Sequence, residues 1–132
     1  MDVKHLEGIP LFADLDRKQR ARVAQLADEI DVAAGKELAT EGRLAYEFFV
    51  IVDGTAHVEV HGEPKGTLGP GDFFGEIGVL ESEHRRVATV KADTPMKLLV
   101  MTAHEFRGLM PDLPGVANKV RAAMAERTAA AS

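Results

Sequence analysis

The glycines of this chain are concentrated in its central part. Twelve glycines occur among 132 residues, and nine of them lie between Gly35 and Gly78. Glycine repeated every few residues is typical of tight turns between short strands, because glycine readily adopts the positive φ angles that such turns need. We therefore expect a β-rich centre, with helices confined to the two ends of the chain.

Two capping patterns mark helix starts outside this centre. Asp16 is followed three residues later by Gln19, and Thr102 is followed by Glu105. Each pair can satisfy backbone N–H groups in the first turn of a helix. The first pattern predicts a helix over about 16–28. The helical ends expected in this way span about 3–28 and about 103–128.

Between these ends the hydrophobic period falls to two. Apolar and polar residues alternate over 55–61, as in a strand with one buried face. Asp53 and Gly54 are expected to form a hairpin turn that joins this strand to the apolar run 48–52. Two later strands are expected over 86–92 and 96–101.

These segments together predict an α+β fold. About eight short antiparallel strands would form a jelly-roll-like β-roll over about 29–101, flanked by N-terminal and C-terminal helices. A length of 132 residues with 45% hydrophobic side chains suits one domain, residues 1–132, with its own core.

Composition excludes several classes of function. No cysteine is present, so disulfides, cysteine-ligated zinc and a cysteine nucleophile are excluded. A net charge of −5 argues against nucleic-acid binding, which needs concentrated Lys and Arg. The longest apolar run, Phe48–Val52, is far shorter than the ~20 residues of a membrane-spanning helix. With no secretion signal in the first residues, we expect a cytoplasmic protein that does not enter membranes.

The most informative segment is Phe73–Leu80, in which two glycines three residues apart flank Glu76. Bare backbone N–H groups in such a turn can approach an anion. Strand alternation over 86–92 places Arg86 on the same face as three apolar residues, and so points it into the core. A buried guanidinium must find an anion. The sequence leaves two partners open, namely Glu76 or a bound phosphate.

The segments Phe74–Leu80 (FGEIGVL) and Arg86–Val90 (RVATV) resemble the phosphate-binding cassette of cyclic nucleotide-binding domains. The family includes the catabolite activator proteins and the regulatory subunits of protein kinase A. Ordered motifs at the right separations extend the resemblance over most of the chain. Further segments that resemble the family are Leu11–Leu15, Ala34–Leu38, Phe49–Gly54 and Gly69–Phe74.

The resemblance implies a role for each cassette residue. Arg86 would bind the cyclic phosphate through its planar guanidinium, and Glu76 would accept the ribose 2′-hydroxyl. No cofactor is implied, because the cyclic nucleotide is a ligand. The backbone N–H groups implied to complete the site belong to Gly75, Ile77, Gly78 and Val87.

The resemblance also bears on the choice of ligand. Family members that prefer cGMP tend to carry a hydroxyl residue directly after the cassette arginine, where this chain has Val87. This favours cAMP, with cGMP as the other candidate. The chain departs from many members in having Arg85 in place of a proline, and we expect Arg85 to be a solvated surface charge. The last helix is the expected lid, with Arg121 as one candidate for covering the base.

Catalytic alternatives are weaker. A jelly roll can be a metal-dependent cupin, but His57 and His61 would lie about 13 Å apart on one strand, too far to share an ion. The serines, Ser82 and Ser132, lack the surroundings of a nucleophile. We therefore expect no enzyme activity and no metal site.

Two functions remain from different classes. The first is a cyclic nucleotide sensor whose ligand moves the C-terminal helices and, through them, an effector. Because few residues follow the last helix, that effector is expected to be a separate protein unless this chain is part of a longer one. The second is a domain that has lost its ligand and serves as an interaction or dimerisation module, with Arg86 paired to Glu76. A homodimer is compatible with either.

Overall fold

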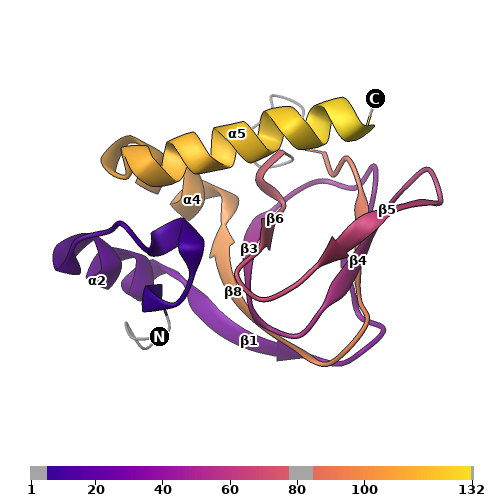
Figure 1. The fold of residues 1–132 in the computed structure, drawn as a ribbon, viewed down its shortest axis with the longest axis horizontal. Helices are drawn as coiled ribbons and strands as arrows, with labels where there is room; N and C mark the ends of the chain where they lie inside the picture. Colours follow the sequence, from indigo (N-terminus) through magenta and orange to yellow (C-terminus); the bar gives the residue numbers. More distant parts are fainter. Residues whose placement is uncertain (1–5, 78–84, 132) are drawn as a thin grey trace.

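The computed structural model describes residues 6–77 and 85–131, with side chains described as far as Arg127. The described strands form two four-stranded antiparallel sheets that close into a β-roll (Figure 1). The first sheet, in spatial order, contains β1 (Asp28–Val32), β8 (Met96–Thr102), β3 (Glu47–Asp53) and β6 (Phe73–Phe74). The second contains β2 (Glu37–Ala39), β7 (Thr89–Ala92), β4 (Ala56–Val60) and β5 (Glu63–Leu68).

Helices lie at both ends of the chain, as predicted (Figure 1). Both capping boxes are formed, with Gln19 returning to Asp16 and Glu105 returning to Thr102. Each therefore satisfies backbone groups at a helix start through contacts only three residues long. The helical elements are η1 (Pro10–Phe12), α2 (Arg17–Leu26), α4 (Ala103–Leu109), η2 (Met110–Asp112) and α5 (Pro114–Ala131). The predicted helical residues 3–5 lie outside the described part of the chain.

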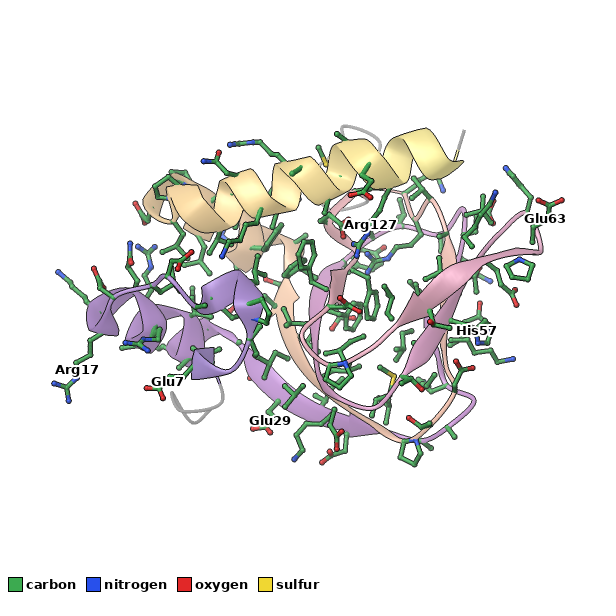
Figure 2. The ribbon with its side chains drawn as sticks, viewed as in Figure 1. Glu7, Arg17, Glu29, His57, Glu63 and Arg127 are labelled. Carbon is green, nitrogen blue, oxygen red and sulfur yellow. The ribbon has the colours of Figure 1, made fainter. Side chains whose placement is uncertain are left out.

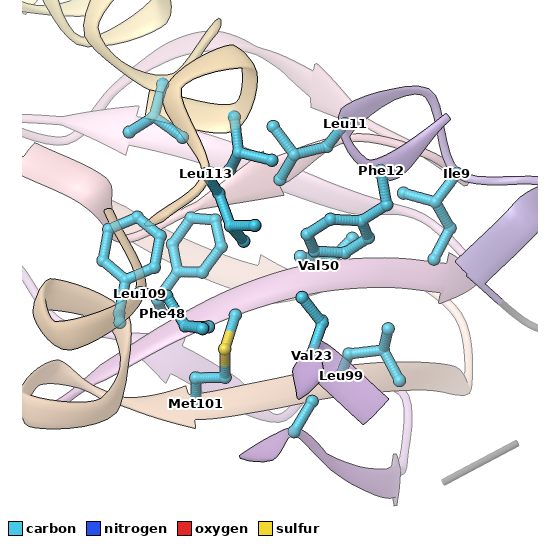
Figure 3. Packing of buried hydrophobic residues seen from close by; sticks show 14 of the residues in the cluster. Ile9, Leu11, Phe12, Val23, Phe48, Val50, Leu99, Met101, Leu109 and Leu113 are labelled. Atoms are coloured by element: carbon cyan, nitrogen blue, oxygen red, sulfur yellow. The ribbon is translucent and has the colours of Figure 1, made fainter. Parts of the chain in front are cut away.

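The central strands of the first sheet, β3 and β8, are buried on both faces. Phe48 and Val50 of β3 face a cluster built with the helices, whereas Phe49 and Ile51 face the inside of the roll. Figure 3 shows the helix-side cluster, in which Phe48 lies beside Met101, its partner on β8. The ring of Phe48 also stacks on that of Phe106 at a centroid distance of 3.9 Å. Double burial explains why β3 has a continuous apolar run in place of alternation.

The expected hairpin at Asp53 and Gly54 is wrong. β3 pairs with β8 and β6, whereas β4 pairs with β5 and β7, so this turn connects two different sheets. Gly54 has a φ of 91°, and a Cβ atom there would lie 2.4 Å from the carbonyl oxygen of Pro95. The turn is therefore a close crossing of two backbones. The local pattern cannot show this, because strand pairing depends on which faces are buried.

The strand predicted over 86–92 is also shorter than expected. β7 begins at Thr89, and the residues before it pair with the loop that precedes β3. The backbone N–H of Arg86 donates to the Arg43 carbonyl at 2.8 Å, and the Gly42 N–H donates to the Arg86 carbonyl at 2.9 Å. Arg86 is buried as predicted. Its inward direction comes from this bent segment, however, and strand alternation is the wrong reason for it.

Candidate functional site

A cavity lies between the second sheet and α5. Its volume is about 190 Å³, whereas a single water needs only roughly 10–15 Å³ on a comparable measure, so it is far larger than a packing defect. Its walls come from β2, β4, β5 and β7, from the segments after β6 and before β7, and from Arg127 of α5. The cavity therefore collects residues from distant parts of the sequence.

The predicted site residues converge on this cavity. One predicted residue, Gly78, lies outside the described part of the chain. The other five all line the cavity, and they are Gly75, Glu76, Ile77, Arg86 and Val87. The segments at 75–77 and 86–87 thus meet in space, as the resemblance implies.

Arg86 is a buried cation held by neutral groups. Only 8% of it is exposed. Its guanidinium donates to the carbonyl oxygens of Glu47 at 2.7 Å and Gly75 at 3.2 Å. It also lies 5.7 Å from the ring centroid of Phe49. In the described part of the chain, Arg86 forms no ion pair with a carboxylate.

The electrostatics of Arg86 follow from this placement. Burial lowers the pKa of its guanidinium from the usual value, and the nearby carboxylates of Glu47 and Glu76 offset part of that change. Arginine nevertheless stays protonated in proteins. The cavity wall therefore presents a positive charge that is largely removed from water and suits an anionic group.

Gly75 makes room for the guanidinium. Its φ is 94°, and a Cβ atom would lie 2.7 Å from Nη1 of Arg86 and 2.9 Å from the Glu47 carbonyl oxygen. Any other residue would both strain the backbone and displace Arg86. The glycine seen in the cassette pattern thus has a direct structural reason in this chain.

Glu76 is paired with the C-terminal helix. The residue is 1% exposed, and its Oε1 accepts a hydrogen bond of 2.7 Å from Nη1 of Arg127. The Arg127 guanidinium also lies 5.0 Å from the ring centroid of Phe73. Figure 2 shows Arg127 between α5 and the roll. A carboxylate of the cassette and a cation of α5 are therefore directly linked.

The Arg86–Glu76 pair expected for a ligand-free module is absent, because Glu76 pairs with Arg127. Arg121, one candidate on the last helix for covering the base, is exposed and does not line the cavity. The sequence pattern did not lead us to predict Arg127 as a cavity residue, although its position on the helix indicates this. It lies seven residues after the buried Val120, and so on the same helical face.

The histidines considered as metal ligands lie elsewhere. Nδ1 of His57 is 2.6 Å from Asp93, and Nδ1 of His61 is 3.0 Å from Glu41, so each has its own carboxylate partner. Residues 6–77 and 85–131 contain no group of three or more side chains placed to hold a metal ion. Among the helices of that part of the chain, none is long and apolar enough to cross a membrane.

The described part of the chain thus combines a β-roll with a cavity that a buried arginine and a glycine turn both line. The family comparison gives the particular class. The family model described as cyclic nucleotide-binding domain matches residues 29–112. The chain therefore belongs to the cyclic nucleotide-binding domain family, and the predicted family is confirmed.

Individual relatives agree with this assignment. The chain is 35% identical over 108 residues to a cAMP-dependent protein kinase regulatory subunit of Schizosaccharomyces pombe, covering 80% of this chain and 26% of that protein. The chain spans less than a third of the length of the curated relatives it matches. It is thus similar to one domain of longer proteins.

Solved structures show the same fold. The catabolite activator protein of Thermus thermophilus superposes with a TM-score of 0.77 at 26% identity, covering 90% of this chain and 58% of that one. The regulatory subunit of a cAMP-independent protein kinase A from Trypanosoma brucei gives a TM-score of 0.81 at 21% identity, covering 92% of this chain and 45% of that one. Because the second protein is described as cAMP-independent, the fold alone does not decide the ligand.

Proposed function

We propose that this chain is a sensor domain that binds cAMP in the cavity and couples this binding to a movement of α5. The observation that carries the proposal is Arg86, a cation 8% exposed that lines a cavity and has no carboxylate partner in the described part of the chain. A phosphate would supply the missing negative charge, and a planar guanidinium suits its oxygens. The relatives that bind cyclic nucleotides support this choice of anion.

The remaining roles follow the family pattern. Glu76 would accept the ribose 2′-hydroxyl, since its carboxylate lines the same cavity as Arg86. Backbone N–H groups of Gly75, Ile77, Gly78 and Val87 would complete the phosphate site. Val87, which lacks a hydroxyl, favours cAMP over cGMP.

The link between Glu76 and Arg127 gives a route from ligand to helix. A ribose hydroxyl that donates to Glu76 would share its carboxylate with the Arg127 guanidinium, which is held there at 2.7 Å. Binding would therefore act directly on an ion pair that links α5 to the cassette. A ligand shifts an equilibrium only through such differential contacts.

The output is proposed to pass to an effector outside residues 1–132, with the chain acting as a single regulatory domain without catalytic activity of its own. Longer relatives such as the kinase regulatory subunit support an arrangement in which this domain controls another part. Dimerisation is compatible with this proposal but is not needed for ligand binding.

The proposal is tested by calorimetric titration of the purified chain with cAMP and cGMP, repeated on Arg86→Ala. Losing one partner of a desolvated charge pair costs about 2–5 kcal/mol, so cAMP affinity should fall at least about thirtyfold. Arg85→Ala is the matched control, because it removes the neighbouring, exposed charge.

Circular dichroism of each variant establishes that it is folded. Tight cAMP binding that is lost only in Arg86→Ala supports the sensor. No heat with either nucleotide, from folded wild-type protein, would contradict it and favour a ligand-free interaction module.

A further inference from the structure

A second cavity lies between α5, η1 and the turn that leads into β6. Its volume is about 330 Å³, which is again far more than a single water needs. Lys119 and Arg127 of α5 line it, and Arg127 is the one residue that the described linings of both cavities share. The roles in the proposed function leave this second cavity unused.

The spacing along α5 places the two cations at a distance from each other on one face. Lys119, Ala123 and Arg127 recur every four residues, so they lie on the same side of the helix. A rise of 1.5 Å per residue separates the backbones of the first and the last by about 12 Å. Ala123 lines the cavity between them with only a methyl group. The middle of this face therefore leaves space that a longer side chain would fill.

Both cations keep hydrogen-bond donors beyond those used in their described contacts. The Lys119 ammonium donates to the Pro10 carbonyl oxygen at 2.8 Å and to the Asp14 carboxylate at 3.2 Å. One of its three N–H groups is left for another acceptor. The Arg127 guanidinium donates to Glu76 through Nη1, which leaves most of its donors. Each end of the α5 face can therefore hold a further anionic group.

The rest of the lining is mostly apolar. The described lining contains one carboxylate, that of Asp72, and its Oδ2 accepts a hydrogen bond of 2.8 Å from the Gly69 N–H. The ring of Phe73 also lines the cavity and lies 5.0 Å from the Arg127 guanidinium. The remaining apolar side chains of the lining are Pro10, Leu11 and Pro70. Two cations against one carboxylate, with apolar walls, suit a ligand that has an apolar body and negatively charged groups.

We propose that the second cavity binds a small organic dicarboxylate, with one carboxylate on Arg127, the other on Lys119 and the apolar body over Ala123. A planar guanidinium fits a carboxylate through two parallel hydrogen bonds, and an ammonium is a compact charge that holds one oxygen. This inference goes beyond the proposed function, because the site needs no cyclic nucleotide. Its occupant would contact the same arginine that links α5 to the cassette.

The probe is terephthalate, a flat dicarboxylate. Benzoate has the same ring with one carboxylate, and benzamide has none. The amide signals of Gly71 and Ala123 in NMR titrations report binding at this cavity, because both residues line it. We expect the wild-type chain to bind terephthalate at least about tenfold more tightly than benzoate, and benzamide to cause no shift.

Lys119→Met tests the second carboxylate contact. It should weaken terephthalate roughly tenfold and benzoate less than about twofold, because benzoate needs only Arg127. Asp14→Asn is the matched control, since it removes the carboxylate partner of Lys119 but keeps the ammonium, and terephthalate should bind at least as tightly as to the wild-type chain. Arg121→Gln controls for net charge, because Arg121 is exposed on α5 and lines neither cavity.

Four results would overturn the assignment. No shift at Gly71 and Ala123 would mean that the cavity does not bind the dicarboxylate, and equal affinities for terephthalate and benzoate would mean that it holds only one anionic group. Equal losses in Lys119→Met and Asp14→Asn would mean that Lys119 acts by fixing η1. Loss of terephthalate binding in folded Arg86→Ala would place the probe in the first cavity. None of these results depends on cAMP, so failure of this inference and failure of the proposed function are distinguishable.

Discussion

A central strand of each sheet, β3 in the first and β4 in the second, shows how differently the two are packed. In β3 of the first sheet, four consecutive residues are buried, because both faces pack against apolar neighbours. In β4 of the second sheet only the two end residues are buried, and those between them are partly exposed. The cavity lies against the second sheet. One sheet is therefore a scaffold, and the other leaves its packing incomplete where a ligand can complete it.

This difference shows where stability and function lie in the molecule. Apolar burial supplies stability in proportion to the area removed from water. A binding site needs the reverse, namely polar groups and space that the chain itself does not fill. Substitutions in the first sheet should mainly lower the free energy of unfolding, and substitutions at the cavity should mainly lower the affinity for cAMP.

The largest expected effect tests the scaffold. Phe48→Ala removes a fully buried ring that stacks on Phe106 and should lower the free energy of unfolding by about 3–5 kcal/mol. Val58→Ala, at a partly exposed cavity position, should cost only about 1 kcal/mol but weaken cAMP binding. Urea unfolding and calorimetry measure the two quantities. Equal unfolding costs would contradict the contrast between the sheets.

The link from the cavity to α5 should give the next largest effect. Arg127→Gln leaves the buried Glu76 carboxylate without its ion-pair partner, which should cost about 1–3 kcal/mol of stability. It should also reduce the change in hydrogen exchange of α5 that cAMP causes in the wild-type chain. Arg121→Gln, on the exposed face of the same helix, is the control. An unaltered exchange response in Arg127→Gln would show that this pair does not carry the coupling.

A pair of glycines separates backbone strain from crowding. Gly75 and Gly62 both have positive φ angles, 94° and 78°, but a Cβ atom added at Gly75 would crowd Nη1 of Arg86, whereas one added at Gly62 would meet no atom within 4 Å. Each change to Ala should cost about 1–2 kcal/mol of stability from strain. Gly75→Ala should in addition weaken cAMP binding roughly tenfold, or about 1.4 kcal/mol. Equal binding by both variants would mean that Arg86 tolerates displacement.

The smallest effect concerns the outer face of the second sheet. The hydrogen bond to Asp93 raises the pKa of His57 above 6.5, a change that burial opposes and the charges of Asp93 and Glu59 reinforce. Because the folded-state pKa is raised, this stabilisation is fully present below the unfolded value. It is lost as the pH rises through the folded value.

The melting temperature of the wild-type chain should therefore exceed that of His57→Gln most at about pH 6, and the difference should shrink by about pH 8. Binding of cAMP should not change, since His57 does not line the cavity. A difference in melting temperature that is independent of pH would exclude this ion pair as its source.

The sequence by itself determined the local features of this protein. The capping boxes at Asp16 and Thr102 involve residues three apart, so backbone geometry decides them without the rest of the fold. The glycine-rich centre predicted short strands, and the cassette pattern brought out Gly75, Glu76 and Arg86. These features can be predicted from the sequence because each depends on residues within a short stretch of chain.

Only the tertiary structure decided which distant groups meet. The sequence could not place β3 and β4 in different sheets. The alternation of apolar and polar residues along a strand does not indicate which other strand it pairs with. It also did not indicate that Glu76 pairs with Arg127, 51 residues away. Such contacts depend on how the whole chain buries its apolar surface, so they cannot be predicted from a short segment of sequence.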